Sequence, residues 1–140
     1  MSFTYSQLQI GDNQSFSKTI TEADILLFAA VSGDYNQIHI NDVYASGTKF
    51  GKRIAHGALT ASLIPAALTL AFPGSVYISQ FCEFTAPVFI GDTITSTVTC
   101  IEKLEKGRVR LQTNCHNQKG DLVLKGEALI RLAPERKPTL

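Results

Sequence analysis

A short polar segment carries the residue types that general acid–base chemistry needs. The sequence Asp-Tyr-Asn-Gln-Ile-His places Asp34, Asn36 and His39 within six positions. A carboxylate and an imidazole that face one water molecule can divide proton acceptance and donation near neutral pH, and an amide can fix their orientation. Each residue also has an ordinary structural explanation, because aspartate is common in turns and a histidine between two isoleucines can be a hydrogen-bonded core residue.

A second segment could stabilise a developing negative charge. The sequence Arg53-Ile-Ala-His56-Gly57 leads directly into the most apolar stretch of the chain. Gly57 has no side chain, so an acceptor can approach its N–H closely, and free amides at a helix start lie at the positive end of the helix dipole. Such a position suits an oxyanion. The alternative is a glycine that only fits a tight helix start.

Two further polar features accompany these segments. Ser62 lies in the apolar stretch, where its hydroxyl either bonds back to a helix carbonyl or contacts a ligand in a pocket. Lys49, Lys52 and Arg53 form a basic cluster that is either a solvated loop or a contact for a phosphate-bearing ligand.

Other common catalytic motifs are absent from the sequence. It contains no glycine-rich dinucleotide or phosphate loop, no Gly-x-Ser-x-Gly and no His-Glu-x-x-His. The three cysteines form no Cys-x-x-Cys pair and do not pair with a histidine at zinc-ligand spacing. We therefore expect no metal ion and no cofactor, with buried free thiols at Cys82, Cys100 and Cys115.

Size and charge narrow the class of protein. A chain of 140 residues is close to the usual size of one domain, so we expect a single domain over residues 1–140. Thirteen basic residues balance twelve acidic ones, which gives no electrostatic reason to expect a nucleic-acid or membrane partner. The longest apolar run, Ile25–Val31, is seven residues, and a membrane span needs about 20. A secretory signal peptide begins with a positively charged region, and no basic residue precedes Lys18. The sequence therefore shows no secretory signal, and a cytoplasmic protein is expected.

The first part of the chain is predicted to be mainly helical. Residues 14–20 alternate polar and apolar residues, which is typical of a short strand. Thr21 can cap a following helix over residues 22–32, and Gly33 can end it. Residues 34–40 have too little periodicity to predict regular structure.

The candidate oxyanion glycine begins the most apolar helical pattern. A short helix is predicted over residues 41–46, followed by a loop over residues 47–56. Residues 57–71 are apolar on all sides, as in a helix buried on most of its surface. Pro65 lacks a backbone donor, so it predicts a kink or break in this helix near residues 61–62.

The remainder of the chain has a strand period of two. Four alternating segments are separated by turn-like residues: 76–84, 93–104, 108–118 and 122–132. Antiparallel strands with one apolar face need a cover, and the helix over residues 57–71 is the candidate long enough to supply it. We therefore predict an α+β fold, with an antiparallel sheet around a central helix and edge strands that could pair with a second subunit.

At these motifs the sequence resembles the MaoC-like (R)-specific enoyl-CoA hydratases of the hot dog fold. The resemblance extends from about residue 16 to residue 132. The family signature Asp-x-Asn-Pro-Ile/Leu-His matches residues 34–39, with Gln37 in place of the proline. The His-Gly that opens the central helix matches residues 56–57, and Phe-x-x-Pro-Val-x-x-Gly-Asp matches residues 84–92.

The resemblance implies a hot dog fold and a lyase of fatty acid metabolism that acts on an acyl-CoA thioester. It implies that Asp34 and His39 activate the water that adds to a trans-2-enoyl thioester, while the Gly57 N–H stabilises the thioester oxygen. It implies a homodimer joined sheet edge to sheet edge, or a higher homo-oligomer. CoA is then part of the substrate and no cofactor is required. Four residues are expected to form the substrate site: Asn36, Arg53, His56 and Ser62.

Two other functions remain compatible with these residues. Hot dog thioesterases commonly carry a carboxylate on the central helix, and residues 57–71 contain no Asp or Glu, which argues against thioester hydrolysis. A non-catalytic acyl-thioester binding subunit of a heterodimer is the other alternative, because a fold alone does not establish activity. The presence of Asp34, Asn36 and His39 together argues against it.

Overall fold

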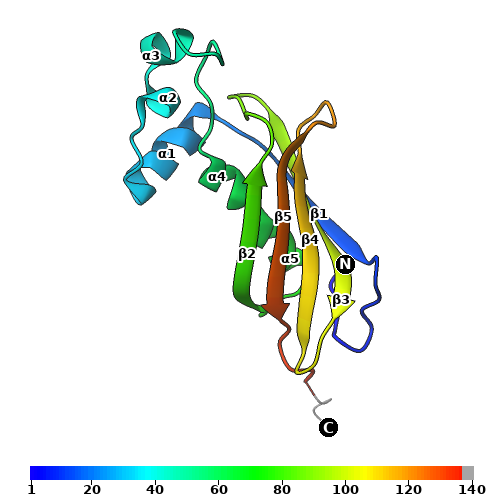
Figure 1. Cartoon of the computed structure of the whole chain (residues 1–140). Coiled ribbons are helices and arrows are strands. Elements are labelled where there is room, and N and C mark those ends of the chain that lie inside the picture. Colours follow the sequence, from blue (N-terminus) through cyan, green and yellow to red (C-terminus); the bar gives the residue numbers. More distant parts are fainter. Residues whose placement is uncertain (137–140) are drawn as a thin grey trace.

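One antiparallel sheet of five strands, in the order β1-β3-β4-β5-β2, forms the main layer of the molecule (Figure 1). The structure is a computed structural model that describes residues 1–136. Every neighbouring pair of strands is antiparallel, which leaves β1 and β2 as the two edges. The strands lie within two residues of their predicted ends: β1 Asn13–Thr19, β2 Val76–Phe84, β3 Thr93–Lys103, β4 Arg108–His116 and β5 Leu122–Arg131.

The inner face of the sheet is set by the two-residue period of its strands. In β4, Val109, Leu111, Thr113 and Cys115 are all buried, whereas the residues between them are partly or fully exposed. Alternate side chains of a strand point to opposite faces, so the predicted apolar face of this strand is confirmed.

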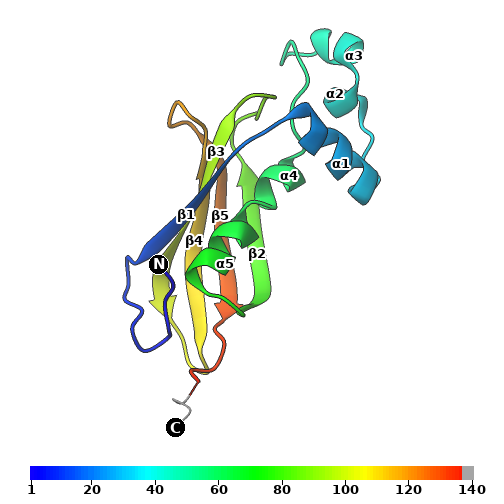
Figure 2. The same cartoon turned by 180° about the vertical axis from the view of Figure 1, so that it is seen from behind.

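The central helix that the sheet encloses is interrupted, as the position of Pro65 predicted. It consists of α4, Gly57–Ala61, and α5, Ile64–Ala71, which follow one another along the inner side of the sheet (Figure 2). Pro65 lies in the first turn of α5, where a missing backbone donor costs nothing, and it cannot continue α4. The predicted break is therefore confirmed, at residues 62–63, one residue beyond the expected position.

The hydrophobic core lies between α5 and the sheet. The α5 helix packs against β1 and β3. Ile64 and Ala67 of α5 are fully buried, and they belong to one apolar cluster with Ile94 and Val98 of β3. This packing fixes the axis along which α4 approaches the site.

Helix α1, Glu22–Ser32, agrees with its predicted ends. The Thr21 hydroxyl accepts a hydrogen bond from the Asp24 N–H, and the Asp24 carboxylate accepts one from the Thr21 N–H. This reciprocal cap satisfies two otherwise free amides at the helix start. Gly33 ends the helix in a left-handed conformation with φ of 77°, which glycine adopts without steric cost.

The segment predicted to be irregular contains a helical turn. The prediction over residues 34–40 is corrected by α2, Gln37–Ile40, in which the N–H of the second residue, Ile38, donates to the Asn36 side chain. A single turn of this kind is held by its cap and needs no apolar periodicity, which explains why periodicity did not reveal it. Asn41 caps α3, Asp42–Ser46, in the same manner, as expected. Helices α1, α2 and α3 lie together beyond the start of α4 (Figures 1 and 2).

The remaining sequence expectations concern thiols and membranes. Cys100 and Cys115 are buried, Cys82 is half-buried, and all three are free thiols. Burial raises the pKa of the Cys115 thiol to about 11. None of the helices within residues 1–136 has both the length and the apolar character needed to cross a bilayer.

Candidate active site

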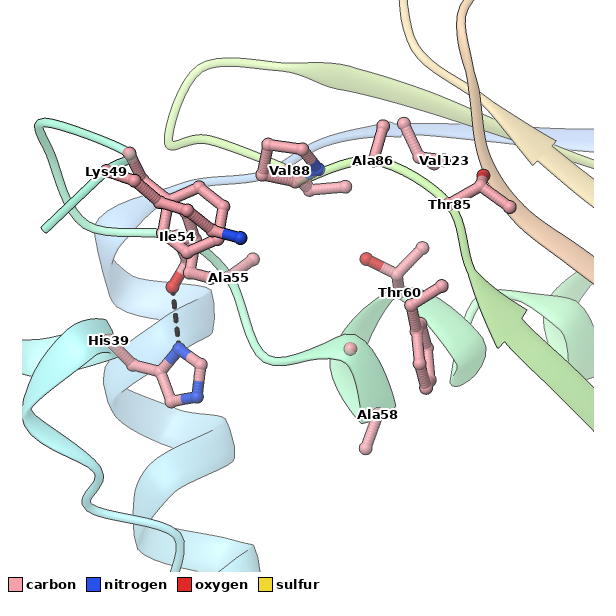
Figure 3. A pocket seen from close by; sticks show the side chains of 14 residues that line it. His39, Lys49, Ile54, Ala55, Ala58, Thr60, Thr85, Ala86, Val88 and Val123 are labelled. Atoms are coloured by element: carbon pink, nitrogen blue, oxygen red, sulfur yellow. Dashed lines mark hydrogen bonds between the residues drawn. The ribbon is translucent and has the colours of Figure 1, made fainter.

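A cavity of about 600 Å³ lies between the start of α4 and the loop that follows β2. Its walls are mainly apolar and come from three segments of the chain: residues 49–55, 57–60 and 84–88 (Figure 3). His39 contributes from α2, Lys49 from the loop after α3, and Thr60 from α4 (Figure 3). The cavity therefore suits an apolar group that carries a few polar atoms.

The imidazole of His39 is oriented by a backbone carbonyl. Its Nδ1–H donates to the Ile54 carbonyl oxygen at 2.8 Å, a bond drawn in Figure 3. This bond leaves Nε2 as the unprotonated nitrogen, which lies 3.9 Å from Oδ2 of Asp34. The His39 side chain is 11% exposed and that of Asp34 is 51% exposed. The two acceptor atoms thus face one another at a separation that a single water molecule can bridge.

The surroundings of His39 keep its ring neutral. Burial is the main cause that lowers the pKa of His39, and the neighbouring His56 lowers it further. The hydrogen bond to Ile54 and the charge of Asp34 act in the opposite direction without reversing the shift. Neutral imidazole is the form that can accept a proton.

Local side-chain bonds shape the loop between α1 and α2. The Asn36 N–H donates to Oδ1 of Asp34 at 3.2 Å, and Oδ1 of Asn36 accepts from the Ile38 N–H at 3.3 Å. Asn36 is exposed and does not line the cavity. It therefore joins the Asp34 carboxylate to the helical turn that carries His39.

Gly57 lies at the first position of α4 and lines the cavity. A Cβ atom at this position would lie 2.8 Å from Cε1 of Phe84 and 3.0 Å from two other atoms of the same ring. These distances are too short for carbon atoms in contact, so a side chain at position 57 would force either the Phe84 ring or the helix start to shift. Gly57 thus combines close contact with the Phe84 ring and a place at the cavity wall.

Arg53 is buried in a network of ion pairs rather than at the cavity wall. Its guanidinium donates to Glu22 of α1 at 2.7 Å and to Asp42 of α3 at 2.6 Å. It also lies 3.5 Å from the backbone carbonyl of His39. The hydrogen bond to Glu22 is the main cause that raises the pKa of Arg53. Arg53 thus links the three helices around His39. Its guanidinium makes its hydrogen bonds within the protein.

Of the two roles that the sequence allowed for Ser62, the back-bond to the helix belongs to Ser62, whereas Thr60 lines the cavity. The Ser62 hydroxyl donates to the Leu59 carbonyl oxygen at 2.5 Å, which is the back-bond to the helix, and Ser62 does not line the cavity. Thr60, which the sequence analysis missed, is 2% exposed and its hydroxyl points into the cavity (Figure 3). A polar residue one turn after Gly57 on an apolar helix is the same signal that selected Ser62.

One group of side chains within residues 1–136 has the composition of a metal site. Asp34, His39 and His56 each offer a ligand atom, and these atoms lie within 4.8 Å of one another. The two imidazole rings are stacked, with centroids 3.9 Å apart and planes 30° apart. A tetrahedral ion needs nitrogen lone pairs that converge from different directions. Nearly parallel rings do not provide this, so the cluster fits proton transfer better than metal binding.

Comparison with known proteins adds a family and a set of relatives. Residues 6–120 match the model of the MaoC-like domain. A Rhodospirillum rubrum (R)-specific enoyl-CoA hydratase is 44% identical over 94% of this chain and 92% of its own length. A 3-hydroxybutyryl-CoA dehydratase of Methylorubrum extorquens is 42% identical over 91% of this chain and 83% of its own length.

A solved structure shares the whole architecture. The R-hydratase PhaJ1 from Pseudomonas aeruginosa, in its unliganded form, superposes with a TM-score of 0.89 at 38% identity. The similarity covers 99% of this chain and 96% of that structure. The arrangement of sheet and central helices is therefore common to both proteins.

Proposed function

The chain belongs to the MaoC-like domain family and has its hot dog fold, and from this premise we propose that it is an (R)-specific enoyl-CoA hydratase. The enzyme adds water across a trans-2-enoyl-CoA to give the (R)-3-hydroxyacyl-CoA, and it catalyses the reverse dehydration. The observation that carries this proposal is the pair of acceptors, Asp34 and His39, which face one another beside an apolar cavity. The hydratase and dehydratase names of its relatives support the reaction class.

The spacing of Asp34 and His39 supports activation of one water molecule. A water that donates one hydrogen to Oδ2 of Asp34 and the other to Nε2 of His39 directs a lone pair away from both groups. The oxygen forms a bond to C3 of the substrate, and the electrons of the double bond move toward the thioester oxygen. The proton accepted by the dyad is then delivered to C2. Neither step transfers electrons to another molecule, so the reaction requires no redox cofactor.

The start of α4 supports stabilisation of the thioester oxygen. This oxygen gains negative charge as C3 is attacked, and Gly57, which has no side chain of its own, lies at the cavity wall at the start of α4. One oxyanion donor contributes about a hundred- to a thousand-fold to turnover in other enzymes. The acyl chain then occupies the apolar cavity, and Lys49 at its wall provides a positive charge for the CoA portion.

Hydration of crotonyl-CoA tests the proposed function directly. We expect loss of the enoyl absorbance with formation of the (R)-3-hydroxy product, checked by chiral analysis. Release of free CoA thiol before loss of that absorbance would support a thioesterase instead. Tight binding of acyl-CoA without turnover of short or longer enoyl chains would support a non-catalytic binding subunit.

The sheet edges support a homodimer joined along β2. Strand β2 exposes Val76 at 61% and Ile78 at 46%, which is unusual for large apolar residues on an unpaired edge. The opposite edge, β1, exposes hydroxyl groups that are already paired with threonines of β3. We therefore propose that β2 pairs with β2 of a second copy, which continues the sheet across the subunits. A cytoplasmic location remains a prediction from the sequence.

A charge on this edge is expected to separate the subunits. Ile78→Lys places an ammonium group where the proposed interface excludes water, so we expect a shift from dimer to monomer in light scattering after gel filtration. Asn13→Lys on the exposed edge of β1 is the matched control and is expected to remain dimeric. An Ile78→Lys protein with the mass of the dimer would contradict pairing along β2.

The lowered pKa of His39 predicts activity that persists into mildly acidic solution. His39 must be neutral to accept a proton, and its pKa lies below the ordinary value of 6.5 because the ring is buried. As the pH falls, kcat/KM is therefore expected to decline only below 6.5, when the folded protein begins to protonate the ring. A pH–rate profile of kcat/KM checks this, and an acidic midpoint at or above 6.5 would show that a neutral His39 is not the base.

A further inference from the structure

His56 is more deeply buried than any other side chain at the candidate site that bears an ionisable group. It is 1% exposed and does not line the cavity, although it immediately precedes Gly57. Its ring packs against two aromatic neighbours. The centroid of His39 lies 3.9 Å away and that of Phe28 of α1 lies 4.9 Å away. His56 is thus placed behind His39's ring rather than among the residues that line the cavity, which differs from its expected place in the substrate site.

The hydrogen bond of His56 reaches the other member of the dyad. Its Nε2–H donates to the backbone carbonyl of Asp34 at 3.0 Å. The other bonds of Asp34 are exposed and local, to the Ser32 hydroxyl at 3.1 Å and from the Asn36 N–H at 3.2 Å. The bond from His56 is therefore the contact that ties the Asp34 loop to the buried part of the molecule.

The His56 side chain makes both the stacking contact with His39 and the hydrogen bond to Asp34. The ring of His56 supports the ring of His39 by stacking, and its Nε2–H holds the main chain of Asp34. Both contacts therefore act on the pair of residues whose Oδ2 and Nε2 atoms lie 3.9 Å apart. A displacement of about 1 Å at reacting groups can reduce a rate about a hundred-fold.

We propose that His56 is a positioning residue that holds the backbone of Asp34 and the ring of His39 at the spacing required by the shared water. This inference rests on the proposed function and adds a role that acts entirely through the two other residues. It implies that His56 affects turnover but not substrate affinity. It also implies that the part of the effect that comes from the lost hydrogen bond disappears once Asp34 has lost its function.

The electrostatic surroundings of His39 provide a readout other than activity. Three ionisable groups face it: the Asp34 carboxylate, the His56 ring, and Arg53 near its backbone carbonyl. Arg53 is compensated by Glu22 and Asp42. His56 lowers the pKa of His39, so an uncharged aromatic ring in its place is expected to raise the pKa of His39.

Two replacements separate the stacking from the hydrogen bond. His56→Phe keeps a flat ring against His39 and removes the donor to Asp34, whereas His56→Gln keeps a donor and removes the ring. We expect each to lower kcat about ten- to a hundred-fold with KM changed less than about three-fold. His116→Gln on β4 is the matched control and is expected to retain the wild-type values.

A double-variant cycle distinguishes positioning from general damage. If His56 acts through Asp34, then Asp34→Asn with His56→Phe is expected to be no slower than Asp34→Asn alone. Multiplied losses in the double variant, or a rise in KM with kcat unchanged, would overturn the proposal. The melting temperature of each variant is measured beside its activity. If His56→Phe does not fold, the cycle is made with His56→Gln and His39→Gln, because His56→Gln removes the ring that stacks on His39.

Titration of His39 by NMR tests the same proposal without any substrate. The His39 ring protons are expected to titrate at a higher pH in His56→Phe than in the wild type, and at the wild-type pH in His116→Gln. An unchanged His39 titration would overturn the proposed contact between the rings. Because this measurement needs no turnover, a failure of the hydratase assignment is distinguished from a failure of the positioning role.

Discussion

Asp34→Asn is expected to reduce hydration of crotonyl-CoA by about a hundred- to ten-thousand-fold, the range that one general acid–base group contributes. The substitution replaces one oxygen of the carboxylate with an NH2 group, which gives an amide of nearly the same shape. An amide nitrogen is a donor and cannot accept a hydrogen from the water that bridges to Nε2 of His39 across 3.9 Å. The rate of loss of the enoyl absorbance, with wild type measured in parallel, gives the result.

The fold is expected to tolerate Asp34→Asn. The Asp34 side chain is 51% exposed, and the bond from the Asn36 N–H can still be accepted by the amide oxygen. We therefore expect an unchanged melting temperature and an unchanged KM, with the loss confined to kcat. Glu105→Gln removes a carboxylate from the exposed turn between β3 and β4 and is the matched control. Hydration by Asp34→Asn at the wild-type rate would falsify the assignment of this carboxylate.

Gly57→Ala is expected to reduce turnover by about a hundred-fold, although it removes no functional group. The new Cβ would lie 2.8 Å from the ring of Phe84, so either this ring, which is 55% exposed and lines the cavity, moves or the start of α4 shifts. The first changes a wall against which the substrate packs, and the second displaces the N–H proposed to face the thioester oxygen. Overpacking of this kind also destabilises a protein by about 1–3 kcal/mol, which thermal unfolding measures.

Removal of the ring tests whether this steric contact is the cause. In Gly57→Ala combined with Phe84→Ala, the Cβ has space, so much of the lost turnover is expected to return. Gly47→Ala is the matched control, because a Cβ there meets only the Tyr44 carbonyl at 3.5 Å and its backbone does not require glycine. A double variant as slow as Gly57→Ala alone would show that the ring is not responsible.

The fold could largely be predicted because its determinants are local. Alternation gave the strands to within two residues of their ends, and the cap formed by Thr21 and Asp24 marked the start of α1. Pro65 marked the interruption between α4 and α5, because a residue without an N–H affects only its own turn. The helical turn α2 escaped prediction, since its stability comes from the Asn36 cap rather than from a repeating pattern.

The sequence by itself determined which groups could do the chemistry, whereas tertiary structure decided how they are used. Asp34 and His39 lie five positions apart, so their proximity follows from a short loop and one helical turn. His56 comes 22 residues after Asp34, and its hydrogen bond to that residue exists only because α1, α2 and α4 converge. Arg53 is buried between Glu22 and Asp42 for the same reason. The sequence gives residue types and local spacing directly. The burial of a side chain and the direction in which it points arise from contacts between distant segments.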